Sequence, residues 1–251
     1  MEKKNEKASR LDACGWNSFK PDLFFEDKGR KHRDVGNDIL CIIQKYSRGD
    51  RVLELCSGGG KLLIHLARSG LHVTGIDLSK DMLEICRENI KKEDRPVQDR
   101  IMIHQDDICT LALKKTFDFI ILEDDGFMYL LTREDQLACL QRVHAHLSED
   151  GLFFLSFATP QKELSSSGGY EYDESSQIKT QVCTWTIINK DGDQQIVKQG
   201  IERRKMTYPD ELESLLAISE LSPVQRWGDL RMNPFTDPLT QEYNYLIKKI
   251  I

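Results

Sequence analysis

From Arg51 onward, short apolar runs alternate along the chain with longer amphipathic segments. Short apolar runs predict buried strands, and longer segments with apolar residues at helical spacing predict amphipathic helices. We expect strands at 51–56, 71–77, 101–107, 117–124 and 151–158, and helices at 61–70, 79–92 and 133–147. Ser79 suits the N-cap of the second helix, and a turn at residues 149–151 leads into the last of these strands. The alternation predicts an α/β fold with right-handed crossovers and a mostly parallel sheet covered on both faces.

The segments on either side of this core have different patterns. Residues 1–12 are highly charged and predict a flexible tail, whereas helical spacing within 33–47 predicts a helical lid over residues 13–48. Later, two apolar runs flank Asp191-Gly192-Asp193, a strong hairpin signal, and a helix at 208–219 and a strand at 241–251 follow. The Ser- and Gly-rich stretch 159–180 predicts a mobile loop. We therefore expect one domain over 13–251, with 159–205 forming a loop and hairpin insertion over the substrate site.

Composition narrows the class of protein. The 251 residues carry a formal net charge of -6 without a Lys/Arg tract, which argues against nucleic acid as a partner. No apolar stretch approaches the roughly 18 residues that span a bilayer, and the charged N-terminus has no apolar segment behind it. We expect a cytoplasmic protein with no membrane partner. The seven cysteines are scattered without C-x-x-C spacing, so neither a disulfide framework nor a metal site is expected.

Three consecutive glycines, Gly58 to Gly60, follow the first predicted strand and precede a predicted helix. Glycine at such a turn lets a ligand approach the backbone closely. A dinucleotide motif places a third small residue where this chain has Leu63, which counts against NAD or FAD. No G-x-x-x-x-G-K-[ST] sequence occurs, which excludes a Walker loop.

The stretch from Glu54 to Gly60, ELCSGGG, resembles the E-x-G-x-G-x-G loop of the class I S-adenosylmethionine-dependent methyltransferases. Asp77, at the end of the second strand, matches the acid that holds the ribose hydroxyls in that family; a carboxylate can accept two hydrogen bonds from a diol. The segment HQDDI is similar to the one in which an acid, here Asp107, meets the adenine amine and an apolar residue, here Ile108, lies against the ring.

The order of these pieces resembles the small-molecule branch of the family over residues 22–251. The loop after the fourth strand reads Glu123-Asp124-Asp125-Gly126, unlike the N-P-P-Y type of the nucleic-acid branches. The resemblance implies a doubly wound, Rossmann-like, seven-stranded sheet with an antiparallel C-terminal strand and an N-terminal helical cover. It also implies S-adenosyl-L-methionine as cofactor and S-adenosyl-L-homocysteine as product. The implied cofactor-binding residues are Glu54, Cys56, Ser57, Gly58, Gly60, Asp77, Leu78, Met82, Asp107, Ile108, Glu123 and Arg33.

Two of these positions leave alternatives open. Arg33 resembles the N-terminal basic residue with which some relatives hold the methionine carboxylate. Cys56 replaces the first loop glycine, where a small side chain either fits or crowds the methionine portion.

Glu123 and Asp125 are the candidate catalytic residues. Acids ahead of a helix favour its positive N-terminal end, which is one explanation for them. The other is that they attract a cationic amine or deprotonate a methyl acceptor. A hydroxyl acceptor usually needs a base or metal, and no metal-ligand spacing is present, so we expect transfer to a nitrogen in preference to an oxygen of a small molecule.

The alternatives are a non-catalytic S-adenosylmethionine-binding partner protein, suggested by Cys56, and transfer or cyclisation of another part of the cofactor. Monomer and homodimer are both compatible with the sequence.

Overall fold

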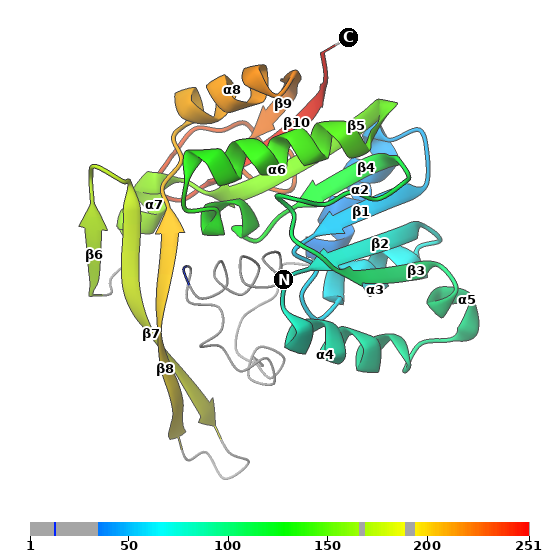
Figure 1. The fold of residues 1–251 in the computed structure, drawn as a ribbon, viewed down its shortest axis with the longest axis horizontal. Coiled ribbons are helices and arrows are strands. Elements are labelled where there is room, and N and C mark those ends of the chain that lie inside the picture. Colours follow the sequence, from blue (N-terminus) through cyan, green and yellow to red (C-terminus); the bar gives the residue numbers. More distant parts are fainter. Residues whose placement is uncertain (1–12, 14–34, 166–168, 189–193, 251) are drawn as a thin grey trace, which may run out of the picture.

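The computed structural model describes residues 13, 35–165, 169–188 and 194–250. They form a seven-stranded sheet in the order β3-β2-β1-β4-β5-β10-β9 and a three-stranded sheet in the order β6-β7-β8 (Figure 1). The strands of the larger sheet are β1 (Arg51–Leu55), β2 (His72–Asp77), β3 (Ile101–Gln105), β4 (Phe117–Leu122), β5 (Leu147–Ala158), β9 (Leu221–Trp227) and β10 (Glu242–Lys249). Strands β1 to β5 pair in parallel, and β10 is antiparallel to both β5 and β9. The predicted fold class is confirmed.

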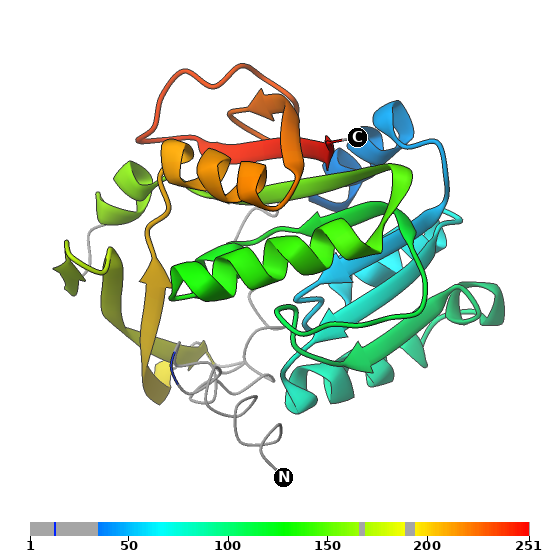
Figure 2. The ribbon, with the colours of Figure 1, turned by 45° about the horizontal axis from the view of Figure 1, so that its top comes forward.

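Helices cover both faces of this sheet. On one face lie α2 (Val35–Tyr46), α3 (Lys61–Arg68) and α4 (Lys80–Ile90), and on the other α6 (Arg133–His146) and α8 (Pro209–Ile218) (Figure 2). Along β4, Phe119 and Ile121 join the apolar cluster under α2 and α3, while Ile120 and Leu122 join the cluster under α6 and α8. A strand buried on both faces is continuously apolar, which explains why the runs show no alternation. The N-terminal cover is α2, whose Ile39 is fully buried.

Local sequence explains where the helices next to the strand ends begin. The Ser79 hydroxyl accepts a hydrogen bond from the Met82 amide at 3.3 Å and caps α4, as predicted.

Leu63 of α3 packs directly over Gly75 of β2, where an added Cβ would lie 2.4 Å from the Leu63 Cδ1. The small residue that allows helix and strand to approach is therefore in the strand, and Leu63 fills the space from the helix.

Two expectations for the second half of the chain were wrong. The strand predicted after a turn at 149–151 already begins at Leu147, and the turn residues produce a break in its register with β4: Phe117 faces Leu147, whereas Phe119 faces Leu152. The stretch 159–180, predicted as a loop, contains α7 (Pro160–Leu164), β6 (Tyr170–Asp173) and the start of β7. The polar composition of this stretch hid the elements, which contribute only partly buried apolar side chains such as Leu164 and Tyr172 to the main core.

Strand β9 was not predicted at all. Its sequence, LSPVQRW, is largely exposed and contains Pro223, and β9 lies at one edge of the large sheet. Proline is tolerated there because an edge strand does not need every amide for pairing.

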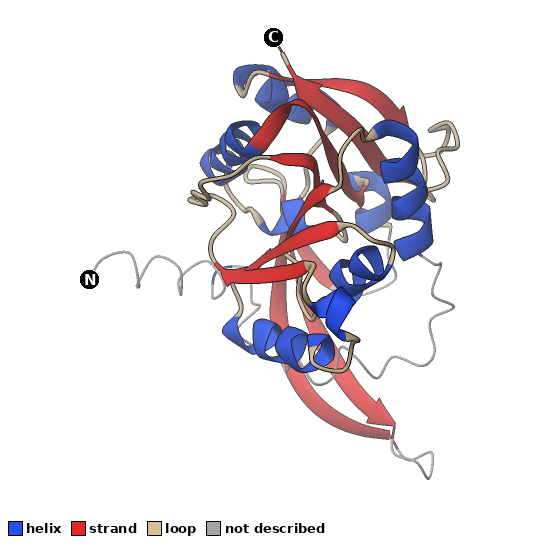
Figure 3. Ribbon diagram, turned by 90° about the vertical axis from the view of Figure 1, so that its right-hand side faces the viewer, coloured by secondary structure: helices blue, strands red, loops and turns tan. Residues whose placement is uncertain are grey.

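The smaller sheet is antiparallel. Strand β6 pairs with β7 (Ile178–Ile188), which pairs with β8 (Gln194–Lys205), and the β7–β8 hairpin extends beyond the body of the domain (Figure 3). The predicted turn at 191–193 lies outside the described residues. Lys179 faces Arg204 across the hairpin, and Gln181 faces Glu202. In the described part of the chain, no helix is long and apolar enough to cross a membrane.

Candidate active site

The carboxyl ends of β1 and β4 mark the place where the strand order reverses. The chain runs outward from β1 to β2 and β3 and then returns to β4 on the other side of β1. Open parallel sheets bind ligands at such a point. The loops after β1 and β4 are in contact there: a Cβ at Gly126 would lie 3.5 Å from the Sγ of Cys56.

The loop after β1 requires an unusual backbone. Cys56, Gly58 and Gly60 have φ values of 59°, 51° and 80°, in the left-handed region that favours glycine. Space is also restricted, because a Cβ at Gly60 would lie 2.5 Å from the Cys86 Sγ and one at Gly58 would lie 3.2 Å from the Met82 Cε. Turn geometry and packing against α4 therefore explain both glycines. Their contact with a ligand stays a prediction, and Cys56 adopts the same type of backbone without being glycine.

Among the described residues, Asp77 is held by backbone amides. Its two carboxylate oxygens accept hydrogen bonds from the amides of Gly58 and Ser79, each at 2.8 Å. Burial raises the pKa of Asp77, and these two bonds oppose the rise. The next carbonyl, of Leu78, accepts from the Gln105 side chain at 3.2 Å. The carboxylate is therefore fixed at the end of β2 and tied to the glycine loop.

Asp107 and Ile108 follow β3 and are both buried, at 5% and 7% exposure. One Asp107 oxygen accepts a hydrogen bond from the Cys109 amide at 2.9 Å. Asp106, its neighbour, accepts from the Asp107 amide at 2.8 Å. Asp106 thus shapes the turn, and the pair Asp107–Ile108 lies at the same sheet edge as Asp77.

Glu54 and Ser57 carry buried oxygen atoms without a hydrogen-bond partner among the described residues, the Glu54 Oε2 and the Ser57 Oγ. Burial raises the pKa of Glu54 well above its usual range, and the nearby charges of Glu123 and Asp77 raise it further. An unsatisfied buried polar atom costs about 1–3 kcal/mol. Such atoms at a strand-end loop have the capacity to bind a polar ligand.

Glu123 immediately follows β4. Burial, followed by the charges of Asp124, Asp125 and Glu242, raises its pKa to about 8, and Lys61 opposes the rise. The carboxyl is thus largely protonated near neutral pH, and it can take up or release a proton within the physiological range.

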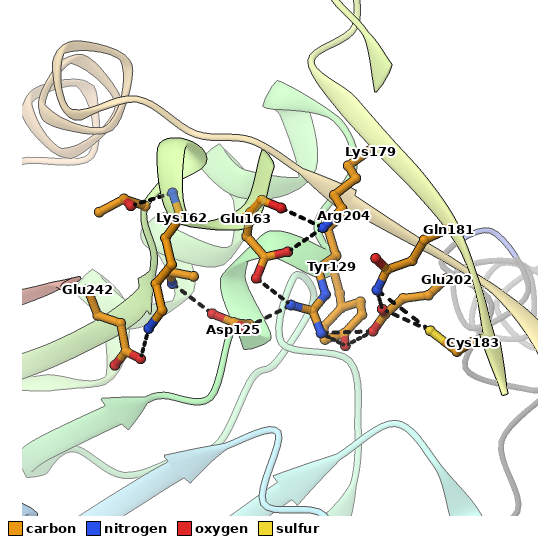
Figure 4. Close-up of polar contacts among 12 residues, drawn as sticks. Asp125, Tyr129, Lys162, Glu163, Lys179, Gln181, Cys183, Glu202, Arg204 and Glu242 are labelled. Carbon is orange, nitrogen blue, oxygen red and sulfur yellow. Dashed lines mark hydrogen bonds and ion pairs between the residues drawn. The ribbon is translucent and has the colours of Figure 1, made fainter. Parts of the chain in front are cut away.

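Asp125 is held on both sides. One oxygen accepts a hydrogen bond from the Ala158 amide at 2.7 Å, and the other pairs with the Arg204 Nη1 at 2.9 Å (Figure 4). Burial raises its pKa to about 6 although Arg204 lowers it. Asp124 and Asp125 have φ values of 54° and 63°, uncommon for residues other than glycine. Asp125 thus holds a strained turn in place. Because both of its oxygens already have partners, Glu123 is the better candidate for proton transfer.

Sequence reasoning missed the charged side chains that surround Asp125. We call this set the charged junction: Asp125, Tyr129, Glu163, Lys179, Glu202 and Arg204. They come from the loop after β4, the 3-10 helix η3 (Gly126–Tyr129), α7, β7 and β8. The sequence signal was only a charged run in β8, which is typical of any solvated strand. Arg33 lies outside the described residues.

No group of three or more metal-ligating side chains is arranged around a common centre in the described ranges.

Comparison with known proteins identifies the domain. A sequence profile described as a methyltransferase domain matches residues 52–151, from β1 into β5. This match and the topology confirm the predicted resemblance to the class I methyltransferases.

The methyltransferase domain has relatives in both sequence and structure. The chain is 31% identical over 112 residues to a putative methyltransferase of Geobacillus, and the match covers 44% of each chain. The chain thus spans less than half the length of this curated relative. The CcbJ methyltransferase from Streptomyces caelestis has the same fold, with a TM-score of 0.80, 18% identity and coverage of 94% of this chain and 98% of that one.

A further solved structure of this fold is an S-adenosylmethionine-bound amino pentose methyltransferase from Micromonospora echinaspora. It has a TM-score of 0.70 and 18% identity, and the alignment covers 92% of this chain and 97% of that one.

Proposed function

We propose that this chain is an S-adenosylmethionine-dependent methyltransferase that transfers a methyl group to a nitrogen or oxygen of a small molecule. The observation that carries the proposal is the grouping of Glu54, Asp77 and the glycine loop at the switch point of the domain that matches the family. The bound S-adenosylmethionine in the amino pentose enzyme of the same fold supports the choice of cofactor.

The residues at the strand ends fit this cofactor. Asp77 suits the ribose hydroxyls, because its oxygens are already oriented by two amides. Asp107 and Ile108 suit the adenine amine and ring. The buried oxygens of Glu54 and Ser57 offer hydrogen-bond acceptors for the amino group of the methionine portion. The cofactor supplies an activated methyl group, and the protein contributes orientation and a site shielded from water.

Glu123 is our candidate for the catalytic proton acceptor. An amine acceptor must be neutral when it attacks the methyl carbon, and a carboxyl with a pKa of about 8 can receive the proton that it loses. We therefore favour transfer to nitrogen, and a small molecule, not nucleic acid, as the acceptor.

Calorimetric binding of S-adenosylmethionine, S-adenosylhomocysteine and NAD tests the cofactor. We expect micromolar affinity for the two sulfur compounds, weakened about tenfold or more in Asp77→Asn, which corresponds to at least about 1.4 kcal/mol. Asp81→Asn, an exposed acid in the first turn of α4, is the matched control and should bind as the wild type. If folded wild-type protein binds neither sulfur compound, the proposal fails.

Product analysis tests the reaction. Incubation with S-adenosylmethionine and matched panels of small amines and alcohols should yield S-adenosylhomocysteine and a methylated product, faster with amines. Methylthioadenosine as product would indicate transfer of another part of the cofactor. Tight cofactor binding with no turnover on either panel would favour a non-catalytic binding protein.

A further inference from the structure

Arg204 of β8 joins the three-stranded sheet to the carboxyl edge of the large sheet. Its Nη1 lies 2.9 Å from Asp125 and 3.2 Å from Glu163, and its Nη2 lies 3.0 Å from Glu202 and 3.3 Å from the Tyr129 hydroxyl (Figure 4). The guanidinium carbon also lies 5.5 Å from the centre of the Tyr129 ring. One side chain, 19% exposed, thus contacts four others.

The carboxylates of the junction outnumber its cations by three to two even with Arg204 present. Three carboxylates, Asp125, Glu163 and Glu202, contact its guanidinium. The second cation of the junction, Lys179, is 2% exposed and pairs with the Glu163 carboxylate at 3.0 Å. Without Arg204, Asp125 and Glu202 would have no cationic partner in the junction. A buried carboxylate that loses its cation becomes protonated or moves toward water.

A movement of Asp125 would change the position of Glu123, because both residues lie in the loop after β4. Asp125 pairs with Arg204 through one oxygen and with the Ala158 amide through the other, so it fixes the loop to β8 and to the end of β5. The left-handed backbone at Asp124 and Asp125 persists only if its surroundings hold it. Glu123 immediately precedes this pair.

We propose that Arg204 is a positioning residue that clamps Asp125 and thereby sets the orientation of Glu123 for methyl transfer. The catalytic part of this inference rests on the proposed function, whereas the clamp itself does not. The planar guanidinium matters because its two terminal nitrogens contact separate pairs of groups. A lysine ammonium has one nitrogen and cannot reach both pairs.

The test compares Arg204→Met and Arg204→Lys with wild type and with Arg203→Met. Arg203 is the neighbouring residue, and its guanidinium donates to the Ala13 carbonyl. Hydrogen exchange of single amides is measured by NMR without ligand. In both Arg204 variants we expect the Ala158 amide to exchange at least tenfold faster. The Gly58 and Ser79 amides, which bind Asp77, should change less than threefold in every variant.

A second readout separates positioning from general stabilisation: the titration of the Glu123 carboxyl by carbon-13 NMR, assigned with Glu123→Gln. The charged groups that act on Glu123 are Asp124, Asp125, Glu242, Lys61 and Glu54. In Arg204→Met, Asp125 becomes neutral or moves away, so repulsion decreases and the Glu123 pKa should fall. In Arg203→Met it should not change.

The clamp is disproved if a folded Arg204→Met protein keeps the wild-type Ala158 exchange and Glu123 titration. Should Arg204→Met not fold, the same two measurements on Arg204→Lys decide, and wild-type behaviour there would equally overturn the proposal. Calorimetry with S-adenosylhomocysteine on the same samples should give wild-type affinity in both Arg204 variants. Failure of wild type to bind it would defeat the proposed function and leave the Ala158 result intact.

Discussion

Asp77 is the last residue of β2 and Asp125 lies in the loop after β4; both are held through two carboxylate oxygens, but by different means. Asp77 accepts hydrogen bonds from the amides of Gly58 and Ser79, which are 19 and 2 positions away in the chain. Asp125 binds one amide and a guanidinium 79 positions away. The glycine-loop region is therefore organised by nearby backbone, and the charged junction by distant charges. The first needs only a correctly formed strand–helix turn, whereas the second needs the whole domain.

The two regions also differ in the free-energy cost of removing charges from water. Backbone amides stabilise the Asp77 carboxylate without burying another charge. The charged junction removes several charges from water, and that penalty is recovered only while every partner is present. Changes in the junction should consequently have large effects, and they should depend on which partner is lost.

The largest effect is expected for Lys179→Met. This change leaves Glu163 with one cation and should cost about 3–5 kcal/mol in the free energy of unfolding, measured by urea denaturation. Adding Glu163→Gln should recover part of the loss, because it removes the uncompensated charge. The control, Lys91→Met, breaks an exposed pair with Glu88 and should cost less than about 1 kcal/mol. A loss below about 1 kcal/mol for Lys179→Met would show that the junction is not held by charge.

The second-largest expected effect is a gain in the free energy of unfolding at high pH. Folding raises the pKa of Glu123 to about 8, so its contribution to stability is fully present below its ordinary pKa of 4.5 and is lost as pH rises through about 8. Glu123→Gln removes this loss and should raise the free energy of unfolding at pH 9 by about 2–4 kcal/mol relative to wild type. Denaturation at pH 5 and pH 9 measures it. An equal difference at both pH values would mean that Glu123 titrates normally.

A smaller loss is expected in the glycine-loop region. Gly75→Ala places a Cβ 2.4 Å from the Leu63 Cδ1 and 2.8 Å from the Ser57 Oγ. Such overpacking should cost about 1–3 kcal/mol. Leu63→Val, which shortens the opposing side chain, should relieve part of the cost in the double variant. If the two changes are additive in thermal unfolding, Leu63 and Gly75 do not pack as described.

The smallest effect concerns the cofactor and rests on the proposed function. A sulfonium near Glu54 and Glu123 favours their ionised forms, so binding of S-adenosylmethionine should release protons where S-adenosylhomocysteine does not. We expect the affinity ratio of the two compounds to rise about threefold to tenfold between pH 6.5 and 9. Glu123→Gln should reduce this rise. A ratio independent of pH would place both acids away from the sulfur.

Prediction from sequence succeeded where neighbouring residues carry the information. The approximate positions of the first four strands, the Ser79 cap and the clustering of Asp77 with the glycine loop all follow from apolar runs and local motifs. It failed at residues 149–151, where turn-forming residues produce a register break inside β5. It failed at β9 as well, because an exposed edge strand has no apolar pattern.

Local sequence patterns were sufficient to predict the large sheet apart from its edge strand β9, its helical faces and the acids at its carboxyl edge. Buried strands need continuous apolar runs, and a sharp strand–helix turn needs glycine, so both leave a local signal. Tertiary contacts bring Arg204 to Asp125 and bury Glu123 so that its pKa is raised. Burial and pairing of charges depend on residues far apart in the chain. The local sequence around a charged residue does not show whether the side chain lies in water or in a buried cluster.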